Sequence, residues 1–196
     1  MNTLLNTIIS IIVAFSISGG VAGMSEVDPA EATQDFINGI SSGNQQITAS
    51  YMDNQYVNFL ENVKGSDEEM DRLETALFKN LDYKIAETAV KGNVAVAKVE
   101  VTTNDFSGVM DDYEKESYKY VMDNLYDSKV TDKSQLNKKC MDIYLDQVEE
   151  TAKDGKTVKK EIFIPMEDNG YYGWKILLND EIMKTLVGGL ELPDSK

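Results

Sequence analysis

The 196-residue chain contains no histidine and a single cysteine, Cys140. Without histidine, Ser-His-Asp and Cys-His nucleophile activation, zinc sites with histidine ligands and histidine acid–base chemistry are all excluded. One cysteine cannot form an internal disulfide, so the fold must be stabilised by packing. Cys140 falls on the apolar stripe of an expected helix, which predicts a buried and inert thiol.

Arginine is nearly absent, because Arg72 is the one arginine among 19 basic residues. Bidentate clamps for phosphate or carboxylate groups are therefore not expected. Against these stand 34 acidic residues, which give a net charge of −15. This charge repels nucleic-acid phosphates and anionic lipid headgroups. We expect no nucleic-acid partner, no cofactor, and no membrane contact other than through an uncleaved amino-terminal segment.

The amino terminus has the pattern of an export signal. An apolar run from Ile8 to Ile17 is followed by small residues at 18–23, and the run is too short for a confident transmembrane helix. We predict a signal peptide over residues 1–23 and a secreted or cell-surface protein. Cleavage after residue 23 and retention as an uncleaved anchor are the two alternatives.

The end of this segment also resembles a lipoprotein processing site. Val21-Ala22-Gly23 is similar to the lipobox of bacterial lipoproteins, but Met24 stands where that motif has its lipid-bearing cysteine. Since Met24 offers no thiol, we expect no lipid attached at this position.

Residues 24–196 have the length of one domain. Helix caps, apolar periodicity and turn residues predict an alternation of helices and hairpins. The helices are expected at about 29–40, 45–53, 66–81, 106–126, 133–153 and 181–187. The strands are expected as two hairpins, 83–90 with 94–103 and 158–166 with 171–178.

Acidic residues at helix starts could suggest a cation site. Asp28-Pro29-Ala30-Glu31 and Ser66-Asp67-Glu68-Glu69 both have the chemistry of capping boxes, in which acids interact with the helix dipole. Neither Asp154-Gly155 nor Asp168-Asn169-Gly170 has the alternating acids of a calcium loop. We therefore predict no metal site and interpret the last two segments as turns.

The hairpins show which side of each strand should be buried. In the first, Ala95, Ala97, Val99 and Val101 share one face, and Lys98, Glu100 and Thr102 share the other. In the second, Trp174 shares a face with Ile176, while Lys175 points away. We expect Trp174 to be buried against the first helix, around Phe36 and Ile40.

These elements predict an α+β domain with a curved antiparallel sheet packed on amino-terminal helices and an inserted helical pair. The chain also contains the motifs Pro29-x-x-Ala32, Phe36, Ser42-Gly43-Asn44, Leu81-x-Tyr83, Gly92-Asn93-x-Ala95-x-Ala97-x-Val99 and Gly173-Trp174-Lys175-Ile176. In these residues it resembles the nuclear transport factor 2-like (cystatin-like cone) superfamily, and more narrowly uncharacterised lipoproteins of Gram-positive, clostridia-like bacteria.

The resemblance implies a single domain over residues 24–196 with a cone-shaped pocket, which in some relatives holds a catalytic Asp, His or Tyr. Here Glu87, Glu100 and Glu161 alternate with apolar neighbours and should face solvent, so no catalytic residue is assigned. Four tyrosines at stripe positions are the candidate ligand-binding residues, with core packing as the alternative. They are Tyr51, Tyr113, Tyr120 and Tyr144.

Three functions remain open from the sequence. The first is a non-catalytic exported envelope protein that binds a small molecule, a peptide or a protein. The second is a pocket enzyme of isomerase or dehydratase type, which needs a carboxylate with a raised pKa beside an apolar cavity. The third is a structural homodimer without a ligand.

Overall fold

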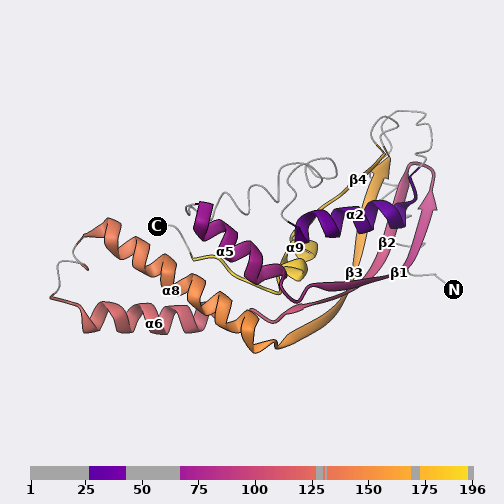
Figure 1. The fold of residues 1–196 in the computed structure, drawn as a ribbon. Helices are drawn as coiled ribbons and strands as arrows, with labels where there is room; N and C mark the ends of the chain where they lie inside the picture. The colour runs from indigo at the N-terminus through magenta and orange to yellow at the C-terminus, as the bar shows by residue number, and fades with distance from the viewer. Residues whose placement is uncertain (1–26, 43–66, 127–129, 131, 169–172, 194–196) are drawn as a thin grey trace. The chain divides into compact units, whose positions relative to one another are not determined.

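The computed structural model describes residues 27–42, 67–126, 130, 132–168 and 173–193 (Figure 1). These residues form two compact units, whose segments alternate along the chain. The sheet unit contains α2 (Pro29–Ser41), β1 (Asp82–Lys91), β4 (Trp174–Ile176) and most of β2 (Val94–Asn104), β3 (Thr157–Asp168) and α9 (Asp180–Leu186). The helical unit contains α5 (Asp67–Phe78), α6 (Val109–Asp123), α8 (Lys133–Asp154) and the segment 186–193.

The sheet has four strands in the order β1-β2-β3-β4, and each hairpin pairs antiparallel. Tyr83 lies opposite Val101 in the first hairpin, and Met166 lies opposite Ile176 in the second. A register shift between Ile85 and Glu87 interrupts β1, and such irregularities bend a strand. Both predicted hairpins and the α+β class are thus confirmed, although β4 is shorter than the predicted strand.

Helix α2 begins as its sequence predicts. The Asp28 carboxylate accepts a hydrogen bond from the Ala30 amide at 2.7 Å, and Pro29 is the first residue of the helix. The helix packs against β1 and β4 with Phe36, Ile37 and Ile40 buried. Trp174 on β4 is 5 % exposed, and its indole donates to the Val27 carbonyl at 2.8 Å. The predicted burial of Trp174 is confirmed.

The outward side of the sheet is held by ion pairs. Lys98 pairs with Glu161 at 2.8 Å, and Lys159 pairs with Glu100 at 2.6 Å. Both pairs connect β2 with β3, and the glutamates keep solvent contact as predicted. At the start of β2, however, Val94 and Val96 are buried as fully as Ala95 and Ala97, so this end of the strand is covered on both sides.

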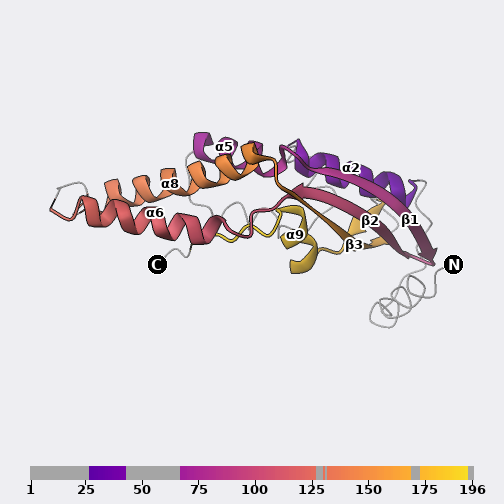
Figure 2. The same ribbon diagram turned by 90° about the horizontal axis from the view of Figure 1, so that it is seen from below.

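In the helical unit, α6 and α8 lie side by side in both views (Figure 2). The Asp132 carboxylate caps α8 by accepting from the amides of Ser134 and Gln135, and Gly155 ends the helix at φ 69°. Helix α5 packs against α8. None of the helices in the described ranges is long and apolar enough to cross a membrane.

Two details of the helical pair differ from the sequence prediction. Helix α6 ends at Asp123, three residues before the predicted end at 126, and Leu125 lies beyond the helix and is exposed. Cys140 is half-buried rather than buried, because only the middle and end of α8 carry fully buried side chains.

Several sequence predictions fall on residues outside the described ranges. They are the signal peptide at 1–23, the position of Met24, the helix at 45–53, the Ser66 cap and the first residues of the strand at 171–178. The single domain over residues 24–196 also stays a prediction.

Candidate functional site

Three of the four candidate tyrosines lie on the α6–α8 pair, and Tyr51 lies outside the described residues. The rings of Tyr113 on α6 and Tyr144 on α8 meet edge to face, with centroids 5.6 Å apart and planes at 88°. Tyr144 is fully buried, and its hydroxyl donates to the Glu191 carbonyl at 2.9 Å. Burial raises the pKa of Tyr144 well above its usual range. These two tyrosines therefore join the helices rather than present a reactive hydroxyl.

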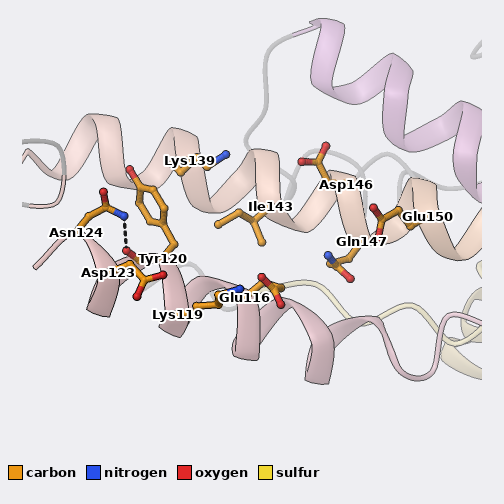
Figure 3. Close-up of a pocket in the computed structure, with 10 residues that line it drawn as sticks. All are labelled: Glu116, Lys119, Tyr120, Asp123, Asn124, Lys139, Ile143, Asp146, Gln147 and Glu150. Carbon is orange, nitrogen blue, oxygen red and sulfur yellow. Dashed lines mark hydrogen bonds between the residues drawn. The ribbon is translucent and has the colours of Figure 1, made fainter.

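Tyr120 lies in a groove of about 320 Å³ between α6 and α8 (Figure 3). The Lys139 ammonium lies 5.8 Å from the centroid of the Tyr120 ring, which is cation–π distance. Ile143 is the apolar residue of the groove (Figure 3). The remaining lining residues are charged or carry amides: Glu116, Lys119, Asp123, Asn124, Asp146, Gln147 and Glu150.

The lining of this groove differs from that of a typical small-molecule pocket. Pockets for drug-sized ligands are lined predominantly by apolar side chains with a few polar groups, whereas eight of the ten residues that line this groove are charged or carry amides. The described residues contain no group of three or more acids or cysteines arranged to hold a metal ion. The groove contains the Tyr120 ring with Lys119 and Lys139 at one end. Further along α8, toward its carboxyl end, it is lined by Asp146, Gln147 and Glu150 (Figure 3).

A second groove of about 660 Å³ lies between α5 and α8, and Arg72 ties its two helices together. The Arg72 guanidinium donates to Glu149 at 2.8 Å and to Asp146 at 3.0 Å. The guanidinium holds the pKa of Glu149 below its usual value. The one arginine of the chain thus serves a contact between helices, and nothing in the local sequence indicated its partners.

The most unusual surface of the helical unit lies at the carboxyl-terminal end of α6, which we call its distal end. Six large hydrophobic side chains are exposed in the described part of the chain, and four of them fall within residues 118–126. These four, which we call the distal stripe, are Tyr118 (69 % exposed), Met122 (50 %), Leu125 (46 %) and Tyr126 (98 %).

The distal stripe lies away from α8. Since an α-helix turns by 100° per residue, Tyr118 and Met122 lie on the side of α6 opposite Tyr113, which contacts α8. The sequence prediction did not include this surface, because within the helix expected at 106–126 it singled out only Tyr113 and Tyr120. The available signal was that α6 carries more apolar residues than one contact face can bury.

Comparisons with protein-family models and with curated proteins give no match. Among solved structures, the chain is similar to one from Bacillus subtilis subsp. subtilis str. 168, described as "a putative lipoprotein (ycdA)", at 17 % identity and a TM-score of 0.43. The similarity covers 85 % of this chain and 48 % of that one, so the chain spans about half the length of its neighbour. A likeness at this level establishes no shared fold, and the nuclear transport factor 2-like fold stays a prediction.

Proposed function

We propose that this protein is an exported, non-catalytic cell-envelope protein that binds another surface through the distal half of its α6–α8 pair. The distal stripe carries the proposal. Soluble monomers rarely leave large apolar side chains clustered in water, and such clusters mark interaction sites. Tyrosine and methionine are also enriched in the cores of protein interfaces.

Export is supported by the sequence alone. The apolar run from Ile8 to Ile17 and the small residues after it have the order of a secretory signal. Met24 argues against lipid attachment, so the proposed location is extracytoplasmic, either free or held by an uncleaved signal segment. The nuclear transport factor 2-like fold remains part of this proposal on the strength of its sequence motifs.

The lack of catalysis is supported by the groups that the chain has and by where they lie. The pocket-enzyme alternative needs an acid with a raised pKa beside a cavity. Burial, with Asp71 nearby, raises the pKa of Glu74 on α5, but Glu74 lines neither of the two grooves described above. The hydroxyls of Tyr83 and Tyr144 donate to an amide oxygen and a backbone carbonyl, respectively, rather than to carboxylates.

Photo-cross-linking in cells that export the full chain tests this function. A benzophenone amino acid at Tyr118 should give adducts in the envelope fraction. The matched control is the same group at Val90, which is 46 % exposed on β1 of the sheet unit. Equal adduct yields at the two positions, or a chain retained in the cytoplasm, would show that the proposed function is wrong.

A further inference from the structure

Charge is distributed unevenly along the α6–α8 pair. Residues 115–139 carry six lysines and four acids, a net charge of +2, in a chain whose net charge is −15. The lysines are Lys115, Lys119, Lys129, Lys133, Lys138 and Lys139, and the acids are Glu116, Asp123, Asp127 and Asp132. The first turn of α6 is instead acidic, with Asp111 and Asp112.

The two ends of α6 are far enough apart to act separately. A helix of 15 residues is roughly 22 Å long at about 1.5 Å per residue. At physiological salt, charges are screened over about 8 Å. A surface that meets the distal end therefore interacts with the local charges of residues 115–139, which sum to +2, rather than with the overall negative charge of the chain.

Two of the lysines lie beside the distal stripe. Residues 115, 118, 119 and 122 follow the three- and four-residue spacing of one helix side, so Lys115 and Lys119 lie next to Tyr118 and Met122, on the side toward the groove that Lys119 lines. Glu114 lies one turn before Tyr118 on the other side. Lys115 also pairs with Asp112 at 2.9 Å, but both side chains are largely exposed and the lysine can reach other anions. Apolar and aromatic side chains beside lysines are typical of helices that lie in a membrane interface.

We propose that the distal stripe, with Lys115 and Lys119 beside it, docks on an anionic lipid surface; this inference rests on the proposed function. Met122 and Leu125 would enter the headgroup–acyl boundary, the two tyrosines would lie at headgroup level, and the lysines would extend to phosphates. One such contact is weak by itself, because stable membrane association generally needs a second anchor. An uncleaved signal segment would supply that anchor.

A second copy of the chain fits this surface less well. Pairing two distal stripes about a two-fold axis would bring Lys115 and Lys119 of both copies toward one another. The area is also small. Two tyrosines bury roughly 150–250 Å² each, and with Met122 and Leu125 the patch stays below the roughly 800 Å² per partner of a standard interface.

An environment-sensitive fluorophore tests the proposal in the full chain. Met122→Cys in a Cys140→Ser background, labelled with NBD, reports on the distal stripe alone, even where the amino-terminal segment also binds vesicles. Vesicles of equal parts phosphatidylglycerol and phosphatidylcholine should raise and blue-shift the emission several-fold, and pure phosphatidylcholine should not. The matched control, Val90→Cys in the same background, should not respond to either vesicle.

Substituting the two lysines tests whether they contribute to binding of the anionic vesicles. Lys115→Gln with Lys119→Gln should weaken the vesicle response at least about five-fold, since each lysine near an anionic surface contributes about that factor.

Emission that rises with protein concentration in the absence of vesicles would assign the surface to a second copy and overturn the lipid proposal. A silent probe together with protein adducts at position 118 would overturn the lipid proposal and leave the proposed function standing. A silent probe without such adducts would overturn both.

Discussion

The sheet unit and the α6–α8 pair use their apolar residues in opposite ways. In β2, Val94 to Ala97, Val99 and Val101 are all fully buried. In the 15 residues of α6, Val109 is the one buried residue, and the distal stripe remains exposed. Apolar residues of the sheet unit therefore build the fold, whereas those at the end of α6 are available to another surface.

The difference has a geometric cause. A strand in the middle of a sheet is paired on both edges and can be covered on both faces, so side chains on either side can be buried. A helix in a two-helix pair has one contact face, which covers little more than a quarter of its circumference. Apolar residues outside that face stay exposed unless a further partner covers them.

The largest expected effect contrasts one aromatic residue from each region. Trp174→Ala removes a side chain that is 5 % exposed and hydrogen-bonded to Val27, and it should lower the free energy of unfolding by about 3 to 5 kcal/mol. Tyr126→Ala removes a side chain that is 98 % exposed and should change it by less than about 0.5 kcal/mol. Urea denaturation of both variants checks this, and similar midpoints for the two would remove the distinction between the regions.

A smaller effect tests how closely the carboxyl-terminal segment of the helical unit is packed. Gly188 has φ 62°, and a β carbon there would overlap the Asn104 carbonyl oxygen and meet the Phe106 ring. Its carbonyl also accepts from the Phe106 amide at 2.9 Å. Gly188→Ala should therefore cost about 2 to 5 kcal/mol, which combines left-handed strain with overpacking.

The adjacent glycine provides the matched control. Gly189 has φ 76°, and no atom lies within 4 Å of a β carbon placed there. Gly189→Ala should cost only the strain, about 1 to 2 kcal/mol. Thermal unfolding of the pair should give a clearly lower midpoint for Gly188→Ala, and the reverse order would contradict the packing of Gly188 on Asn104.

The smallest expected effect is a pH dependence at the start of α6. Lys156 at 2.7 Å, together with Ser107, lowers the pKa of Asp105 from 3.8 to about 2. Because the folded pKa lies below the unfolded one, the stabilisation is complete above about pH 4 and is lost as the pH falls toward 2. Lys156 is largely exposed, so the contribution should be at most about 1 kcal/mol.

Asp105→Asn should remove this contribution at pH 7 and flatten the loss of stability between pH 4 and 2. The control is Asp112→Asn, whose partner Lys115 is an exposed neighbour one turn away, and which should change stability by less than about 0.5 kcal/mol. Equal acid profiles for wild type and Asp105→Asn would show that the pair with Lys156 does not form in solution.

Features that depend on neighbouring residues could be predicted from the sequence. The Asp28 cap, the hairpin turn at Gly92 and the stop at Gly188 follow from local hydrogen bonding and from backbone conformations that glycine favours. The alternation of Trp174, Lys175 and Ile176 across β4 follows from the strand period of two. The end of α6 was placed three residues too late, because residues 124–126 are apolar or amide-bearing and include no helix breaker.

The candidate site could be predicted only in part. The periodicity placed Tyr113, Tyr120 and Tyr144 on two helices, and the structure brings Tyr113 and Tyr144 into contact while it leaves Tyr120 in a polar groove. The partners of Arg72 lie more than 70 residues away, at Asp146 and Glu149. No local pattern contains such a contact.

The sequence by itself determined the order of the described helices and strands, the Asp28 cap, the alternation across β4 and the absence of histidine chemistry, because each depends on residue type and short-range spacing. Only the tertiary structure decided which of two apolar sides of α6 is covered. Burial depends on what packs against a residue, and α8 covers the side of Tyr113 while Tyr118 and Met122 are left exposed. The sequence shows that α6 has more apolar residues than one face can bury, but only the packing of the two helices shows which of them form the proposed binding surface.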